Sequence, residues 1–122
     1  MTAASGSGRL TTHVLDTALG KPAAGLKIEL FSLNGAERVH RTSAVTNEDG
    51  RTDAPMLAGA DFAAGQYELV FKAGDYLRTT GAGEGLLFLD EIPIRFGIGD
   101  ASQHYHVPLL LSPFGYSTYR GS

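Results

Sequence analysis

The chain has 122 residues, of which 43% are hydrophobic, and it carries a formal net charge of −3 at neutral pH. This length predicts a single domain with a core of its own. The sequence has no cysteine, which excludes disulfides and thiol nucleophiles. Without a basic stripe we expect no nucleic-acid partner, and without an apolar run of ~20 residues we expect no membrane partner.

The first residues, MTAASGSGR, are small and mostly polar. They lack the apolar segment of a secretory signal, and a chain without such a signal is expected to stay in the cytoplasm. We therefore predict a disordered N-terminal lead over residues 1–9, one folded domain over residues 10–122 and a cytoplasmic location.

The first half of the domain predicts short strands separated by turns. Strands are expected over residues 10–16, 26–33 and 39–46, with a further short strand over residues 51–57. In the second of these, Leu26, Ile28 and Leu30 alternate with charged residues, which is typical of a half-buried strand. The segment over residues 39–46 is more polar, so we expect it at the edge of a sheet.

The second half continues the same pattern. Strands are predicted over residues 66–73, 86–98, 104–111 and 115–121, and the glycine-rich segment 74–85 is expected to be a short helix or an irregular crossover. Pro93 lacks an amide donor, so its strand is expected at an edge. The chain as a whole predicts an all-β, antiparallel two-sheet sandwich of seven or eight strands with at most one short helix.

Strand periodicity predicts one polar and aromatic sheet face. Side chains two residues apart share a face, which groups His104 and His106 with Pro108 on one strand, and Tyr119 with Gly121 on the last. If these strands lie beside the first one, the same face also receives His13. We therefore expect His13, His106 and Tyr119 to lie together.

The histidines have three interpretations from their residue types alone. They are surface or structural residues, zinc ligands from the His-x-His pair with His13 as a third ligand, or general acids and bases with near-neutral pKa values. Arg51 follows an Asp-Gly turn and offers a fork of donors to a carbonyl or carboxylate, although a solvated surface arginine has the same signature. No Gly-x-Ser-x-Gly motif supports a serine nucleophile.

Three stretches resemble a known family. The C-terminal HYHVPLLLSPFGYSTYRGS, the N-terminal LTTHVLDTALGKPAAGLKIEL and the internal TNEDGR are similar to the signature segments of the 5-hydroxyisourate hydrolases, the transthyretin-related enzymes of urate breakdown. The resemblance runs from Leu10 to Ser122, and its C-terminal motif is the most specific part.

The resemblance implies a transthyretin-like sandwich that assembles as a homotetramer, with active sites in the channel between dimers, and hydrolysis of 5-hydroxyisourate without a cofactor or metal. The alternative is a transthyretin-like carrier that binds a small ligand without turnover. The family's functional positions fall on two sets of residues. The implied catalytic residues are His13, Arg51, His106 and Ser122, and the implied substrate-binding residues are His104, Pro108, Tyr119, Arg120 and Gly121.

Overall fold

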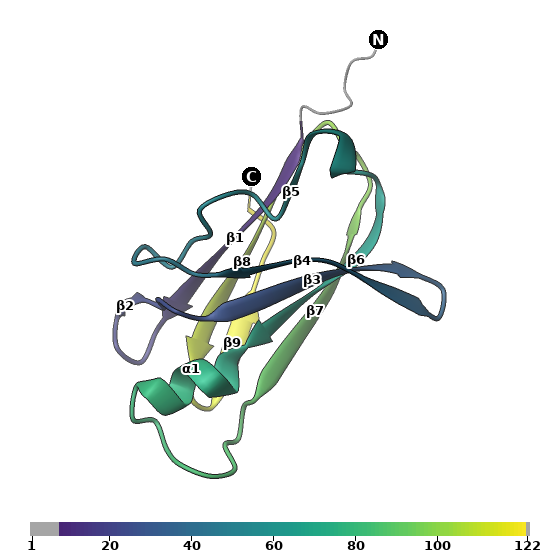
Figure 1. The fold of residues 1–122 in the computed structure, drawn as a ribbon. Helices are drawn as coiled ribbons and strands as arrows, with labels where there is room; N and C mark the ends of the chain where they lie inside the picture. The colour runs from purple at the N-terminus through teal and green to yellow at the C-terminus, as the bar shows by residue number, and fades with distance from the viewer. Residues whose placement is uncertain (1–7, 122) are drawn as a thin grey trace.

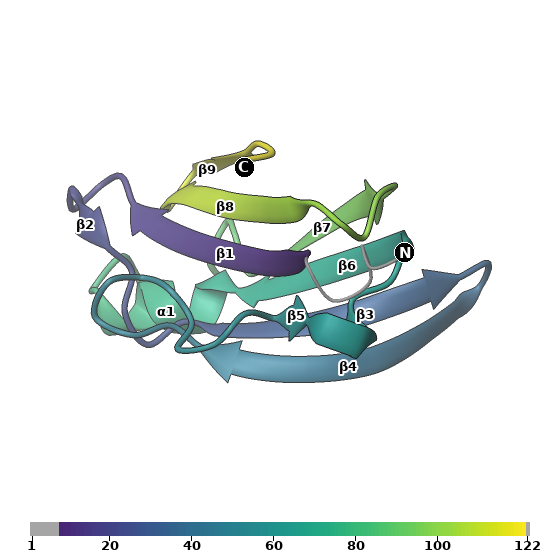
Figure 2. The ribbon, with the colours of Figure 1, turned by 90° about the horizontal axis from the view of Figure 1, so that it is seen from above.

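A computed structural model describes residues 8–121 of the chain. Over this range the protein is a two-layer β-sandwich with one short helix (Figures 1 and 2). The elements in chain order are β1 (Arg9–Asp16), β2 (Lys21–Pro22), β3 (Lys27–Asn34), β4 (Glu37–Val45), β5 (Leu57–Ala58), a 3-10 turn (Gly59–Asp61), β6 (Gly65–Lys72), α1 (Ala73–Thr79), β7 (Glu91–Ile98), β8 (His104–Ser112) and β9 (Gly115–Thr118).

The strands form two sheets, which confirms the predicted sandwich. One sheet has the order β2-β1-β8-β9, with β5 also paired to β1, and the other has the order β4-β3-β6-β7. All pairs are antiparallel except β1 and β8, which run parallel over eight residues. The expectation of a purely antiparallel sandwich is wrong at this pair. A parallel neighbour needs a long connection, and the second sheet supplies it because its strands lie between β1 and β8 in sequence.

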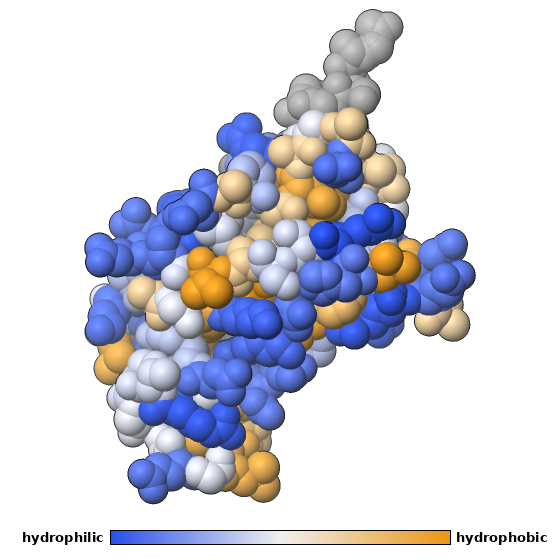
Figure 3. Space-filling view, in the orientation of Figure 1, coloured by the Kyte–Doolittle hydropathy of each residue, from blue (hydrophilic) through white to orange (hydrophobic). Residues whose placement is uncertain are grey.

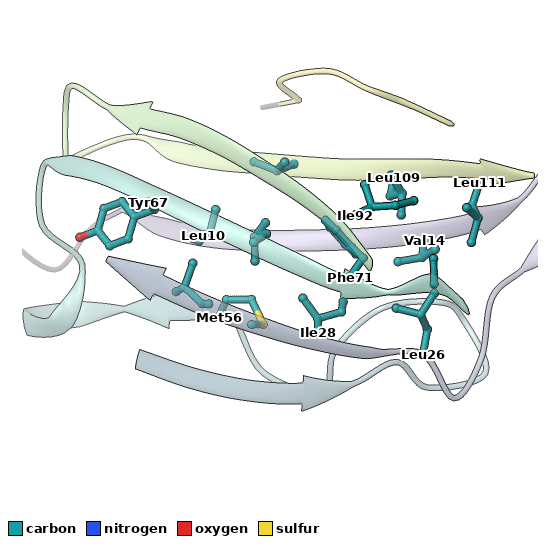
Figure 4. Close-up of a cluster of buried hydrophobic side chains, with 14 of the residues drawn as sticks. Leu10, Val14, Leu26, Ile28, Met56, Tyr67, Phe71, Ile92, Leu109 and Leu111 are labelled. Carbon is teal, nitrogen blue, oxygen red and sulfur yellow. The ribbon is translucent and has the colours of Figure 1, made fainter. Parts of the chain in front are cut away.

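The core lies between the two sheets (Figure 4). Leu10 and Val14 from β1, Leu109 from β8, and Ile28 and Phe71 from the facing sheet are completely buried. Their neighbours along β1 and β8 point to the opposite face. The register is therefore strongly specified, because a slip of one residue would exchange core side chains for polar ones.

The edges of the second sheet agree with the sequence. The polar strand β4 and the proline-containing strand β7 occupy its two edges. Along β7, Ile92 is buried while Glu91 and Pro93 are exposed, the alternation typical of a strand with one face on the core. An edge position allows Pro93, because a proline has no backbone N–H to donate and an edge strand has a side on which no neighbouring strand needs that hydrogen bond.

Three predicted strands are shorter than expected. Residues 51–57 contain only a single bridge at Arg51 before β5, because the chain turns there to run along β1. The strand expected over residues 86–98 begins at Glu91, since Leu87 and Leu89 pack against the core instead of pairing with a neighbour. The last strand ends at Thr118, and pairing with β8 resumes only at Gly121.

The short helix α1 begins at Ala73, one residue before the segment 74–85 where a helix or crossover was expected. Its Tyr76 donates a hydrogen bond of 2.7 Å from the hydroxyl to a carboxylate oxygen of the buried Asp16, at the end of β1. Burial and this carboxylate raise the pKa of Tyr76. The bond fixes the end of β1 against the helix. In the part of the chain that is described, no helix is long and apolar enough to cross a membrane.

Candidate active site

The pairing of β1 with β8 gathers histidines on the outer face of their sheet. Thr11 lies opposite His106 and His13 lies opposite the buried Pro108 in the parallel register. The ring centroids of His13 and His106 are 6.5 Å apart, and those of His104 and His106 are 6.3 Å apart. The order β1-β8-β9 confirms the predicted adjacency of the three strands.

Arg51 reaches this face from the far edge of β1. It forms an isolated antiparallel bridge with His13, next to the hydrogen bond from the Val14 amide to the Gly50 carbonyl. The preceding turn is held by Asn47, whose side-chain oxygen accepts hydrogen bonds from the amides of Asp49 and Arg51. Asn47 therefore fixes the backbone that carries the guanidinium.

Gly50 makes this close approach possible. Its φ of 75° lies in the left-handed region, where other residues are strained. A Cβ at this position would meet the Val14 carbonyl oxygen and would lie 3.2 Å from the His13 ring. The glycine lets the turn pass directly beside the histidine face.

A hollow in the surface opens on this face, and His13 lies beside it without lining it. Arg51, His104 and His106 line it from the side of the predicted site, and Arg9 and Asp53 contribute charged groups to its wall. The other lining residues are Thr11, Thr12, Thr52, Ala54 and Pro55. The hollow thus combines imidazoles, a guanidinium and hydroxyls, which suits a polar, planar ligand with carbonyl groups.

The electrostatics of the face favour neutral imidazoles. Burial lowers the pKa of His106, and the positive charge of Arg51 and the neighbouring His104 and His13 lower it further. Burial and Arg51 also lower the pKa of His13, while a backbone hydrogen bond and the carboxylate of Asp49 act in the opposite direction. Neutral imidazoles at physiological pH are ready to accept protons.

The C-terminal tail packs directly on His106. The Gly121 amide donates to the His106 carbonyl at 2.7 Å, and the His106 amide donates to the Gly121 carbonyl at 3.4 Å. A Cβ on Gly121 would lie 3.0 Å from Cδ2 of the imidazole. The tail therefore forms a wall that limits where the ring of His106 can sit.

Known proteins share both the sequence and the architecture of this chain. Residues 10–121 match the model of the HIUase/transthyretin family. A 5-hydroxyisourate hydrolase of Mesorhizobium japonicum is 64% identical over 124 residues, covering 99% of this chain and 98% of the relative. The chain belongs to the HIUase/transthyretin family.

Two solved structures from the family extend the comparison. The 5-hydroxyisourate hydrolase of Klebsiella pneumoniae matches with a TM-score of 0.78 and 36% identity, over 94% of this chain and 99% of that chain. Transthyretin of sea bream, solved in complex with thyroxine, matches with a TM-score of 0.83 and 24% identity, over 93% of this chain and 94% of that chain. The second likeness confirms the transthyretin-like fold.

Not every predicted site residue of this family member lies in the hollow. Tyr119, 60% exposed, and Arg120 line a separate hollow with Tyr105 at the open edge between the sheets. The Arg120 guanidinium lies 4.2 Å from the centre of the Tyr105 ring. The expected grouping of Tyr119 with the histidines is not found within this chain, because the strand alternation stops after β9. Ser122 lies outside the described residues.

Two residues that hold the site were not predicted from the sequence. Asn47 opens an Asn-Glu-Asp-Gly turn, and asparagine in that position commonly bonds to the backbone two residues on. Thr11 shares a strand face with His13, a spacing too common in strands to single it out. In the described residues, no group of three or more His, Cys, Asp or Glu side chains is arranged to hold a metal.

Arg51 should influence the pKa values of His13 and His106. Replacing Arg51 with methionine removes the positive charge that lowers the pKa of His106 and His13, so both pKa values should rise. The pKa of His106 should stay below its ordinary value of 6.5, because burial, the larger cause, and the neighbouring histidines still lower it. NMR titration of the imidazole signals measures both.

Arg41→Met is the matched control for this titration. Arg41 bonds to Ser32 on the other sheet, and its replacement should leave both titrations unchanged. Equal pKa values in wild type and Arg51→Met would contradict the electrostatic role of Arg51. With the lowered pKa values of the wild type, the neutral imidazoles persist below pH 6.5 and become protonated only as the pH falls through those values.

Proposed function

We propose that this chain is a 5-hydroxyisourate hydrolase, which opens the six-membered ring of its substrate at the N1–C6 amide. The product would be 2-oxo-4-hydroxy-4-carboxy-5-ureidoimidazoline, a step of urate breakdown. The observation that carries the proposal is that Arg51 and His106 line one hollow. His13 lies beside them, bridged through its backbone to Arg51 and 6.5 Å from His106 between ring centroids, so that three distant parts of the chain meet on one sheet face. The relative from Mesorhizobium japonicum with 64% identity supports the same reaction.

His106 is proposed to move the protons of this reaction. Water loses a proton to the neutral imidazole as its oxygen attacks C6, and the C6–N1 bond then breaks as N1 takes up a proton. The lowered pKa of His106 supports its role as the base. His13, 6.5 Å away between ring centres, is the second candidate for these transfers. The reaction balances with water alone, so the proposal requires no cofactor.

Arg51 is proposed to stabilise the oxygen that becomes negative when water attacks C6. A guanidinium held in place before the reaction stabilises developing charge without reorganisation. The backbone bridge to His13 and the turn at Asn47 support this assignment, because both fix the backbone from which the guanidinium extends toward the hollow.

The remaining predicted residues keep their proposed roles, a catalytic one for Ser122 and substrate binding for Pro108, Tyr119, Arg120 and Gly121. Pro108 is buried under the histidine face, and Gly121 forms the wall against His106. Ser122 is proposed to position the water or the substrate. Tyr119 and Arg120 face a separate hollow in this chain, so they would reach a site through a neighbouring copy.

The proposal includes a homotetramer with its sites in a channel between dimers. Exposed apolar side chains support an assembly: Leu86 is 99% exposed, and the rings of Phe88 and Phe114 lie 6.0 Å apart on the surface. Figure 3 shows apolar surface at the bottom of the view, where the loop between α1 and β7 lies in Figure 1. Closed symmetry would make the sites equivalent. Analytical ultracentrifugation tests this, and a stable monomer would contradict it.

A cytoplasmic location also belongs to the proposal. The chain has no cysteine, so its folding would require no oxidising compartment.

The deciding experiment is a spectrophotometric assay in which urate oxidase generates 5-hydroxyisourate in place. The substrate decays spontaneously, so only acceleration over that background counts. Catalytic acceleration by the protein supports the hydrolase. Saturable binding of the substrate without acceleration would instead identify the carrier expected as the alternative.

Replacing Gly121 with alanine should slow this reaction by about 10-fold. The added Cβ would lie 3.0 Å from the His106 ring, so the imidazole must shift by a few tenths of an ångström, and small misplacements of a catalytic group are costly. The measurement is kcat in the same assay. Gly99→Ala is the control, since a Cβ there meets nothing within 4 Å. Equal rates for the two variants would contradict the role of the wall.

A further inference from the structure

The hydroxyl of Thr11 lies between two imidazoles. Its oxygen is 2.7 Å from Nε2 of His104 and 2.8 Å from Nδ1 of His106. The parallel register produces this contact, because Thr11 on β1 is directly opposite His106, and His104 is two residues earlier on the same face of β8. Three side chains from two strands thus form one hydrogen-bonded chain.

A hydroxyl has a single proton, which couples the two imidazoles. If Thr11 donates that proton to His106, Nδ1 of His106 has no hydrogen and Nε2 carries one. If Thr11 donates to His104, it accepts a hydrogen from Nδ1 of His106, and Nε2 of His106 is left with its lone pair. The bond made by one ring nitrogen decides which form the other nitrogen takes.

Only the second arrangement allows His106 to act as a base toward the hollow. Across residues 8–121, Nε2 of His106 has no hydrogen-bond partner, so it is the nitrogen available to a substrate or a water. The same arrangement persists after His106 has gained a proton, because Nδ1 still donates to Thr11. The hydrogen bonds among His106, Thr11 and His104 therefore stay the same whether His106 is neutral or protonated.

We propose that Thr11 and His104 are positioning residues, which hold His106 with its hydrogen on Nδ1 and its lone pair on Nε2. In this arrangement His104 accepts the hydrogen bond of Thr11, and Thr11 accepts that of His106. The assignment rests on the proposed function for its catalytic meaning, but the position of the hydrogen is a property of the protein alone. It gives His104 a role that does not require contact with the substrate.

The test compares Thr11→Val, which keeps the shape but removes the hydroxyl, with Thr11→Ser, which keeps the hydroxyl. Thr11→Val should lower kcat by about 10- to 100-fold with KM changed by less than about threefold, because the wrong tautomer disables a base without removing it. Thr11→Ser should retain kcat within about threefold. Thr17→Val is the control, since it removes a comparable hydroxyl bond to β8, outside the hollow.

A second readout is independent of activity. Nitrogen-15 NMR of the histidine rings reports which nitrogen of His106 carries hydrogen: Nδ1 in the wild type, and a mixture in Thr11→Val. His104→Leu should give the same mixture, and it replaces Thr11→Val if that variant does not fold. Hydrogen on Nε2 of His106 in the wild type would overturn the proposal, as would an unchanged kcat in Thr11→Val. Absence of turnover in the wild type would overturn the proposed function, while the NMR result would still decide the hydrogen-bonded chain.

Discussion

Replacing His106 with alanine is expected to lower kcat for 5-hydroxyisourate by about 100- to 10,000-fold, the range that a positioned general base contributes. The half-buried imidazole lines the hollow beside Arg51, and its lowered pKa keeps it neutral and able to accept a proton. The fold should persist, because the side chain points away from the core, and the backbone pairing of this residue with Thr11 and Gly121 does not depend on the imidazole. The one side-chain hydrogen bond lost is that between Nδ1 and the Thr11 hydroxyl. If His106 acts only on the transition state, kcat and kcat/KM should fall together.

The control for this variant is His40→Ala. His40 lies on β4 in the other sheet, where it bonds to Ser43, so its loss should leave kcat unchanged. Full activity in His106→Ala would exclude it as the base. A larger loss in His13→Ala than in His106→Ala would assign that role to His13 instead, since the two rings are 6.5 Å apart at the same face.

Local periodicity was sufficient to predict which side chains face the core. Alternation along β3 and β7 depends only on neighbouring residues, so the burial of Ile28 and Ile92 followed directly from their positions in the sequence. The same rule placed His104 and His106 together on the outer face of β8. These predictions are confirmed because a strand shows its two faces within a few residues.

Pairing between distant strands was harder to predict. The adjacency of β1, β8 and β9 was expected and is confirmed, but the parallel direction of β1 and β8 was not. Strand direction is set by the connection, and here the connection is a whole second sheet. That direction matters for the site, because the parallel register is what places Thr11 between His104 and His106.

The supporting residues of the site could not be found by residue type. Asn47 acts through backbone amides, and Thr11 acts through a single hydroxyl. Both lie inside the stretches that resemble the family, but neither residue type by itself indicates catalysis. Tyr119 shows the opposite error: alternation placed it with the histidines, but β9 ends at Thr118 and the face is no longer determined beyond that residue. Sequence periodicity applies only as far as the strand extends.

Deleting residues 119–122 should lower kcat by at least about 100-fold while the sandwich stays folded. The deletion removes the two backbone hydrogen bonds between Gly121 and His106, and it removes the glycine that packs against the imidazole. The ring can then move by about 1 Å, and a misplacement of that size typically lowers the rate about 100-fold. The core should be unaffected, because its buried side chains come from residues 10–111 and β9 keeps its pairing with β8 through Thr118. The measurements are kcat and the thermal unfolding midpoint.

A single substitution separates the parts of the tail. Replacing Ser122 with alanine keeps the pairing of Gly121 with His106 and removes only the serine hydroxyl. If the serine hydroxyl positions the water, this variant should also lose activity, although less than the full deletion. If it retains the wild-type rate while the full deletion does not, the wall formed by Gly121 accounts for the effect. A normal rate after deletion of all four residues would remove the tail from the proposed site altogether, and His106 would then be positioned by β1 alone through Thr11.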